Sequence, residues 1–129
     1  MNNIAHTLID EDIKMACETL RQGGLILYPT DTVWGIGCDA TNTKAVERVY
    51  KLKRRNDSKA LIVMLADENQ LLRYVEDVPD IAFELIEVAV KPLTIVYDNA
   101  INMSEALCAE DGSVGIRVTR ENFSQRLCK

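Results

Sequence analysis

The chain has 129 residues, 47% of them apolar, and carries a formal net charge of −5. This length allows one hydrophobic core and is too short for two ordinary domains, so we expect a single domain over residues 1–129. The negative charge argues against a surface adapted as a whole to nucleic acid, because phosphate binding is driven by Lys and Arg, and any anion site must be local.

The first part of the chain predicts a helix followed by two strands. Apolar residues recur at steps of three and four over residues 10–20, which begin with acidic residues and are followed by Gly23-Gly24. This pattern predicts an amphipathic helix with an acidic N-terminus and a glycine stop. Residues 25–28 and 33–38 are short apolar runs, and they predict strands joined through Pro29-Thr30-Asp31-Thr32.

The middle of the chain predicts a second helix and a buried strand. Asn42 or Thr43 can cap a helix that ends in the basic residues 51–55, where cations complement the helix dipole. Residues 60–65 are continuously apolar, which predicts a strand buried on both faces of a sheet.

The rest of the chain alternates helices with strands. We expect helices at residues 68–74, 80–90 and 122–128, strands at residues 93–97 and 114–118, and a polar loop or short helix at residues 98–113. This alternation indicates an α/β fold in which helices cover a sheet on both sides. No apolar run approaches the roughly 20 residues that span a bilayer, so we expect a soluble, cytoplasmic protein without membrane contact.

The cysteines do not form a metal-binding pattern. Cys17, Cys38, Cys108 and Cys128 are scattered without a Cys-x-x-Cys pair, and His6 is the one histidine. This argues against a structural zinc site and a Cys–His nucleophile pair, and we expect no metal-ligating residue. The chain lacks a signal peptide and does not look like a small secreted scaffold, so reduced thiols are expected.

A basic cluster at residues 51–59 includes Lys53, Arg55 and Lys59 and runs directly into the buried strand. Neither a Gly-x-x-x-x-Gly-Lys-Ser/Thr loop nor a Gly-x-Gly-x-x-Gly turn is present, so side-chain cations would have to hold a bound nucleotide. Two interpretations stay open from this stretch alone. It is a solvated helix end that compensates the helix dipole, or an anion site at the end of a central strand, where ligands gather.

The segment Pro29-Thr30-Asp31-Thr32 lies between the first two expected strands. Proline, aspartate and threonine are ordinary turn formers, so a plain turn is one interpretation. The other is a rigid polar ledge, with two hydroxyls flanking a carboxylate, that orients an amino acid.

Arg117 interrupts an apolar strand. Alternation places its side chain on the face opposite to Ile116 and Val118. An arginine in this position is either exposed on an edge strand or holds an anion, and the residues alone leave both alternatives open.

Four motifs in order make the chain recognisable. They are residues 24–40, with Pro29-Thr30-Asp31-Thr32 at their centre; Lys53-Arg54-Arg55 with Lys59-Ala60-Leu61; Lys91-Pro92-Leu93-Thr94; and Ser113 with Val114–Val118. Together they resemble the YrdC-like family of threonylcarbamoyl-AMP synthases over almost the whole chain. The resemblance implies an open, twisted, mixed sheet flanked by helices.

The resemblance implies an enzyme that condenses L-threonine, bicarbonate and ATP into threonylcarbamoyl-AMP and pyrophosphate. The product would feed threonylcarbamoyladenosine formation in tRNA, through a downstream tRNA threonylcarbamoyl transferase. ATP would be a substrate, and Mg²⁺ would help to offset the charge of its phosphates. A threonine amine that captures carbon dioxide becomes a carbamate, whose oxygen can attack the α-phosphorus of ATP. Such a reaction needs positioning and cations more than protein acids or bases.

The resemblance also implies roles for particular residues. Threonine would contact Thr32, the backbone at Met64, and Arg117, which suits its carboxylate. ATP would contact Lys53, Arg55, Lys59 and Ser113, with Lys53 and Arg55 as the catalytic cations.

The chain departs from the family pattern in four places. Asn56 and Ala60 stand where the family has proline, and Lys91-Pro92 replaces Pro-Gly-Pro, which changes loop rigidity more than charge. The family also carries a Ser-x-Ala-Asn element after the strand that matches Val114–Val118, and the chain stops at Lys129 before reaching it. We therefore expect a truncated chain and a fold that is incomplete at its C-terminal end.

Two alternatives to this function stay open. One is a tRNA or double-stranded RNA-binding module in which the cations of residues 51–59 hold a phosphate backbone, although the net charge makes a broad RNA surface less favourable. The other is a relative that uses a different carbamoyl substrate.

Overall fold

The computed structural model describes residues 2–30, 34–53 and 61–129, with the backbone alone for residues 2–9, Trp34 and Lys53. The elements, in chain order, are α1 (Asn2–Arg21), β1 (Ile26–Pro29), β2 (Trp34–Gly37), α2 (Thr43–Lys53), β3 (Val63–Leu65), η2 (Glu68–Gln70), α3 (Leu71–Tyr74), α4 (Asp80–Val88), β4 (Thr94–Tyr97), η3 (Glu105–Leu107), β5 (Val114–Val118) and α5 (Asn122–Cys128). Among the described helices, none is long and apolar enough to cross a membrane.

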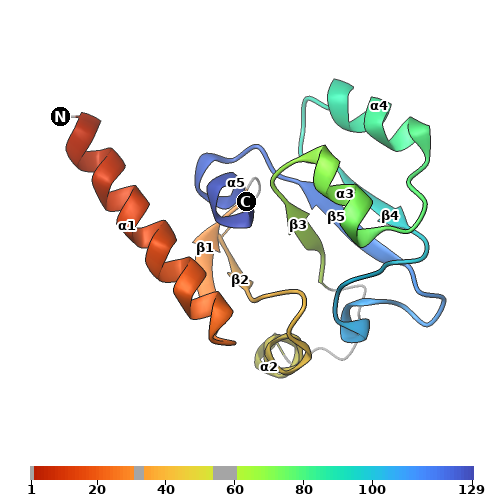
Figure 1. Ribbon diagram of the computed structural model, residues 1–129, viewed down its shortest axis with the longest axis horizontal. Coiled ribbons are helices and arrows are strands. Elements are labelled where there is room, and N and C mark those ends of the chain that lie inside the picture. Colours follow the sequence, from red (N-terminus) through yellow and green to blue (C-terminus); the bar gives the residue numbers. More distant parts are fainter. Residues whose placement is uncertain (1, 31–33, 54–60) are drawn as a thin grey trace.

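The described strands form two sheets (Figure 1). β1 and β2 make an antiparallel hairpin. The second sheet is mixed and has the order β3-β5-β4, with β3 parallel and β4 antiparallel to the central β5. The predicted mixed α/β architecture is confirmed. Within these residues the hairpin and the mixed sheet share no strand pairing, which periodicity does not address because it identifies strands and not the edges that pair.

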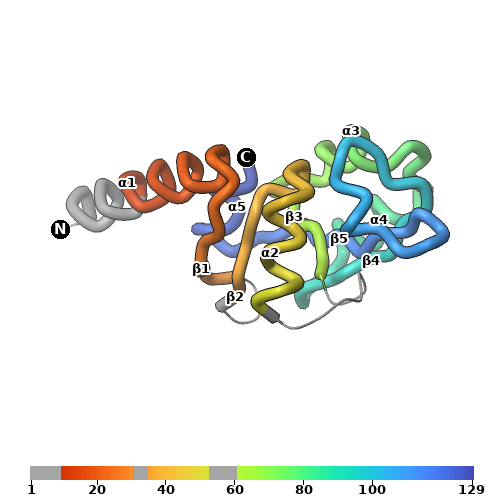
Figure 2. The backbone as a smooth tube through the Cα atoms, turned by 90° about the horizontal axis from the view of Figure 1, so that it is seen from below, coloured from red at the N-terminus to blue at the C-terminus, as the bar shows by residue number. Residues whose placement is uncertain are grey.

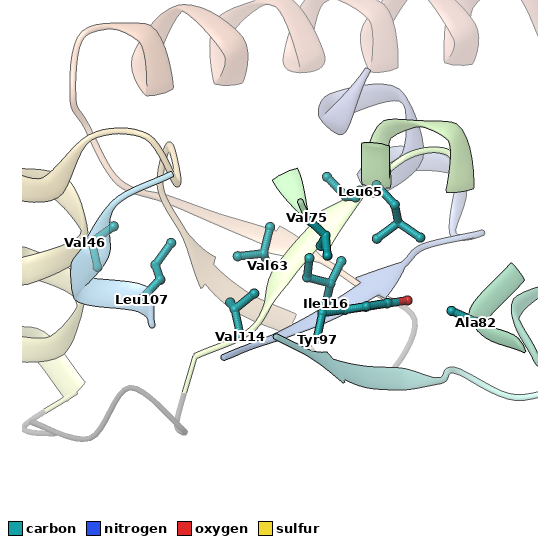
Figure 3. Packing of buried hydrophobic residues seen from close by; sticks show 10 residues of the cluster. Val46, Val63, Leu65, Val75, Ala82, Tyr97, Leu107, Val114 and Ile116 are labelled. Atoms are coloured by element: carbon teal, nitrogen blue, oxygen red, sulfur yellow. The ribbon is translucent and has the colours of Figure 1, made fainter. Parts of the chain in front are cut away.

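The hydrophobic core covers one face of the mixed sheet. Val63, Val114, Ile116 and Tyr97 are buried there, and Ile116 on the central strand is only 2% exposed. Figure 3 shows these side chains together, with Ala82 of α4 near the Tyr97 ring. Among the described residues, every buried side-chain polar atom has a hydrogen-bond partner.

Helix α1 is longer than the sequence predicts. It begins at Asn2, so the acidic residues 10–12 lie in its middle and its first turn contains none. The expected start at residue 10 is wrong because acidic residues favour a helix start without requiring one, and residues 2–9 contain no glycine or proline. The glycine stop is confirmed: Gly23 has φ 83°, and the amide of Gly24 donates to the carbonyl of Thr19 at 2.9 Å.

The predicted cap of α2 is confirmed, whereas the predicted burial of β3 on both faces is not. Asn42 caps α2, since its Oδ1 accepts a hydrogen bond from the Ala45 amide at 3.0 Å. Strand β3 is shorter than predicted, and only Val63 and Leu65 are buried. Met64 faces the other way and is half-buried, so the expectation of a strand buried on both faces is wrong.

The hairpin depends on a close contact between a tyrosine ring and a glycine. A Cβ atom added to Gly37 would lie 2.6 Å from Cε1 of Tyr28 and 3.2 Å from its Cδ1. A Cβ at Gly35, two residues earlier on the same strand, would meet only Cγ2 of Thr30, at 3.8 Å. The Tyr28 ring therefore occupies the space that a side chain at position 37 would need.

We predict that Gly37→Ala lowers the free energy of unfolding by about 1–3 kcal/mol, because the added methyl group must displace the Tyr28 ring. Urea unfolding followed by circular dichroism measures this change. Gly35→Ala is the matched control and should cost less than Gly37→Ala. Equal costs for the two variants would contradict the role given to the ring contact.

Candidate functional site

A cavity of about 380 Å³ separates the hairpin from β3. The hairpin contributes Ile26, Tyr28, Ile36 and Gly37, and the five successive residues 61–65 line the opposite side. The C-terminal parts of α1 and α5 also contribute, through residues such as Cys17 and Leu127. The volume falls within the range of small-molecule sites, which are usually hundreds of Å³, and the lining mixes apolar side chains with a few polar groups.

Tyr28 and Met64 connect the two sides of this cavity. The Tyr28 hydroxyl donates to Sδ of Met64 at 3.8 Å, across the space between β1 and β3. A thioether is a weak acceptor, so this contact contributes more to position than to stability. The Tyr28 ring, held over Gly37, thus helps to place the hairpin relative to the mixed sheet, together with α5, which contacts both β1 and β3.

Arg117 lies at the centre of the mixed sheet. Its backbone is in register with Met64 of β3 on one side and with Thr94 of β4 on the other. Its Nε donates to Oγ1 of Thr94 at 3.0 Å, and its side chain is half-buried. Because β5 is paired along both edges, the interpretation of Arg117 as an exposed edge residue is excluded.

The guanidinium of Arg117 has donors beyond Nε. Within the described residues, Thr94 is the one hydrogen-bond partner of this side chain, and no described carboxylate forms an ion pair with it. A guanidinium has five N–H donors in a planar fork that matches a carboxylate. The arrangement leaves its terminal amino groups able to bind an anion on the open face of the sheet.

Ser113 lies directly before β5. Its carbonyl accepts from the Ala109 amide at 2.9 Å, and its own amide donates to Oδ1 of Asp111 at 3.0 Å. These bonds close a turn that positions the start of the strand. Ser113 is four residues from Arg117, or about 13 Å along an extended strand, so both residues can contact one elongated ligand.

The remaining predicted site residues are less completely described. Thr32, Arg55 and Lys59 lie outside the described residues, and Lys53 ends α2 with its backbone alone described. Among the others, Met64 lines the 380 Å³ cavity, whereas Arg117 and Ser113 do not. The structure therefore brings Met64 and Arg117 together on adjacent strands and places Ser113 at the start of the second strand.

Sequence reasoning missed two groups in the cavity wall, Tyr28 and Cys38. The signal for Tyr28 was its position directly before Pro29-Thr30-Asp31-Thr32. Burial, with a smaller contribution from the neighbouring Asp39 carboxylate, raises the pKa of the Cys38 thiol to about 11. All four cysteines are free thiols. Within the part of the chain that is described, no group of three or more His, Cys, Asp or Glu residues is placed to hold a metal ion.

We predict that Cys38 reacts with iodoacetamide at pH 8 roughly a hundredfold more slowly than an ordinary thiol, because only the thiolate is the nucleophile. Mass spectrometry of alkylated peptides measures the rate, and the same residue in urea is the internal control. The pKa of Cys38 is raised from 9.0 to about 11 in the folded state. The neutral thiol therefore stabilises the folded protein below this range, and that stabilisation should be lost as the pH rises from 9.0 to about 11. Alkylation that is equally fast in the folded and the urea-unfolded protein would contradict the assignment.

Comparisons with known proteins identify the family of this chain. The model of the Sua5/YciO/YrdC family, described as telomere recombination, matches residues 18–129. A threonylcarbamoyl-AMP synthase from Pseudomonas paraeruginosa is 40% identical over 114 residues, which are 88% of this chain and 62% of that protein. One from Halorhodospira halophila is 34% identical over 117 residues, covering 90% of this chain and 61% of that protein. The chain thus spans somewhat less than two thirds of the length of these relatives.

Solved structures show the same fold. P. abyssi Sua5 in complex with L-threonine superimposes with a TM-score of 0.82 at 28% identity, covering 89% of this chain and 34% of that chain. E. coli YciO gives a TM-score of 0.76 at 26% identity, covering 91% of this chain and 57% of that chain. The family resemblance inferred from the motifs is confirmed, and the chain belongs to the Sua5/YciO/YrdC family.

Proposed function

We propose that the protein is a threonylcarbamoyl-AMP synthase, which forms threonylcarbamoyl-AMP and pyrophosphate from L-threonine, bicarbonate and ATP. The observation that carries this proposal is Arg117, an arginine on the central strand with its Nε held by Thr94 and its terminal amino groups open to an anion. The family membership, the relatives named threonylcarbamoyl-AMP synthase and the likeness to a protein that binds L-threonine support it.

In this proposal, threonine binds between the hairpin and the mixed sheet. Arg117 binds its carboxylate through the guanidinium fork, which leaves the amine free to react. The backbone at Met64, one strand away, and Thr32, which falls between β1 and β2 in the sequence, would hold the rest of the amino acid. The Tyr28–Met64 contact would keep these two walls at a fixed separation.

The reaction then needs little protein acid or base. The threonine nitrogen bonds to the carbon derived from bicarbonate, with loss of water, and gives a carbamate. A carbamate oxygen attacks the α-phosphorus of ATP, and the bond to pyrophosphate breaks. Lys53, Arg55 and Lys59, together with Ser113, would position the nucleotide and offset the charge that develops on the leaving group.

Mg²⁺ would reduce the charge of the ATP phosphates. Mg²⁺ commonly takes oxygen ligands from substrate phosphates together with one or two carboxylates. Asp39 is a carboxylate in the described cavity wall, and its Oδ1 already accepts from the amide and hydroxyl of Thr41 at 2.9 and 2.7 Å. Most of the oxygen ligands of Mg²⁺ would therefore come from the triphosphate of ATP and not from the protein.

The product would serve a tRNA threonylcarbamoyl transferase in the cytoplasm. Direct binding of tRNA or double-stranded RNA by residues 51–59 stays a prediction, since most of these cations lie outside the described residues. A tRNA titration at two salt concentrations tests it, because several phosphate contacts give a steep loss of affinity with salt. Serine in place of threonine in the pyrophosphate assay tests the alternative of a different carbamoyl substrate.

We predict that pyrophosphate release from ATP requires both L-threonine and bicarbonate. Lys53→Ala and Arg55→Ala should each lower the rate by about a hundredfold or more, because each removes a cation that stabilises transition-state charge. Lys44→Ala removes an exposed cation from the same helix α2 and is the matched control. Unchanged rates in both variants would overturn the assignment of these residues, and release without threonine would overturn the function.

We predict that Arg117→Lys weakens L-threonine binding, measured by titration calorimetry, by roughly tenfold or more, since Lys keeps the charge and loses the planar fork. Thr94→Val should have a smaller effect in the same direction, because it frees Nε and loosens the guanidinium. Arg73→Lys, at an exposed position of α3, should bind threonine normally. Equal affinity in Arg117→Lys and the parent protein would exclude Arg117 from the site.

A further inference from the structure

Helix α2 is joined to the short helix η3 at two points. Near the start of α2, Oγ1 of Thr43 lies 2.9 Å from Oγ of Ser104, at hydrogen-bond distance. Near its end, the Tyr50 hydroxyl donates to the carbonyl of Ala106 at 3.0 Å. Thr43 and Tyr50 are seven residues apart, so both lie on the same face of the helix. The segment that contains η3 thus follows α2 along most of its length.

The segment that receives the Tyr50 hydrogen bond is itself fixed. The Leu107 amide donates to the carbonyl of Ser104 at 3.1 Å, which closes the turn around Ala106. The side chain of Leu107 is buried in the same apolar cluster as Val46 of α2 (Figure 3). The carbonyl of Ala106 is therefore an acceptor in a defined place. This contact joins two segments that pack on the core, so it does not rely on an exposed surface.

The last turn of α2 depends on this contact. Val49 is buried, with 1% of its surface exposed, whereas Lys51 is exposed and Leu52 is 61% exposed. Among the described side chains after Val49, that of Tyr50 is the one that is not exposed. Helix ends fray where few tertiary contacts hold them. The hydroxyl of Tyr50 therefore ties the end of α2 to the rest of the structure.

The position of this hydrogen bond along α2 decides which residue it controls. Lys53 is the last residue of the helix. At 1.5 Å per residue, Lys53 lies about 4.5 Å along the axis from Tyr50 and about 15 Å from Thr43. A hydrogen bond close to the end of a helix limits the movement of that end more than one at its start. Tyr50 thus fixes where α2 ends, at a residue proposed to contact the nucleotide.

The other end of the hydrogen bond leads to a second proposed nucleotide contact. Ser113 follows Ala106 by seven residues, through a turn that two backbone hydrogen bonds close. The Gly112 amide donates to the carbonyl of Ala109 at 2.9 Å, and the Ala109 amide donates to the carbonyl of Ser113 at 2.9 Å. One side-chain hydrogen bond therefore connects the segments that carry Lys53 and Ser113. Their spacing matters, because a misplacement of about 1 Å can lower a rate by about a hundredfold.

We propose that Tyr50 is a positioning residue for the nucleotide. Its hydroxyl fixes the last turn of α2 against the segment that leads to Ser113, and Lys53 is thereby held at the separation from Ser113 that ATP requires. This inference rests on the proposed function, in which both residues contact ATP. Tyr50 acts through Lys53 and not by touching a substrate. Threonine binding does not depend on it, since Arg117 lies on β5, which is paired along both edges.

Tyr50→Phe tests this role, because phenylalanine keeps the ring and its packing and removes the hydroxyl alone. The affinity for ATP in the presence of Mg²⁺, measured by titration calorimetry, should fall roughly fivefold, as expected for the loss of one hydrogen bond. The affinity for L-threonine should not change. Thr43→Val is the matched control, since it removes the hydroxyl that joins α2 to η3 at the other end of the helix. It should bind ATP as the parent protein does.

A double-mutant cycle identifies the residue through which Tyr50 acts. In the Lys53→Ala background, Tyr50→Phe should weaken ATP binding by roughly twofold or less, because the cation that Tyr50 positions is absent. Circular dichroism and urea unfolding establish that each variant is folded. An equal loss of ATP affinity with and without Lys53 would give Tyr50 no role beyond packing and would overturn the proposal.

Other results would also overturn it. These are an unchanged ATP affinity in Tyr50→Phe, an equal loss in Thr43→Val, and a loss of threonine affinity as large as the loss of ATP affinity. The proposed function fails by a different result, pyrophosphate release that does not require L-threonine, so the two failures are distinguishable. A parent protein that does not bind ATP would overturn both.

Discussion

The structure depends on the pairing of β5 along both of its edges. Because neighbours on both sides fix the register of this strand, its alternation is fixed as well, and successive side chains must point to opposite faces of the sheet. Ile116 is committed to the core and Arg117 to the open face. A shift of one residue would bury the guanidinium and expose the isoleucine, so the energy that holds the core together also aims the candidate anion-binding group.

The position of the hairpin against the mixed sheet depends on side-chain and helix contacts. These two sheets share no strand pairing within the described residues, and a cavity lies between them. Tyr28 crosses from one to the other, with its ring over Gly37 and its hydroxyl at Met64. Helices also line the cavity. Of these, α1 packs on α5 (Figure 2), with an ion pair between Asp10 and Arg126. The cavity is therefore bounded by packed elements and not by loops alone.

Local signals predicted much of this fold. The glycine stop after α1, the Asn42 cap of α2 and the bounds of β5 and α5 all follow from residues within a few positions of each feature. The start of α1 could not be predicted in the same way, because no residue before position 10 forbids a helix. The division of the strands into two sheets is a matter of pairing between distant segments, which no local pattern specifies.

The candidate site likewise has parts that local patterns predict and parts that only the tertiary structure shows. Alternation alone placed Arg117 opposite to Ile116, but only the sheet order showed that its strand is central and that Thr94 binds its Nε. The cavity, and the part of Tyr28 and Cys38 in its wall, arise from tertiary packing between β1, β2 and β3. The roles of Thr32, Arg55 and Lys59 rest on the motifs and not on geometry.

The contact between Tyr28 and Gly37 also constrains how this protein can diverge. The space beside the glycine is already filled by the ring, so position 37 cannot gain a side chain without cost while the tyrosine keeps its place. A descendant that acquires a side chain at position 37 has to displace the ring or replace it with something smaller, and either change would disturb the contact between the hydroxyl and Met64. A side chain at position 37 should therefore be found through evolution together with a smaller residue at position 28.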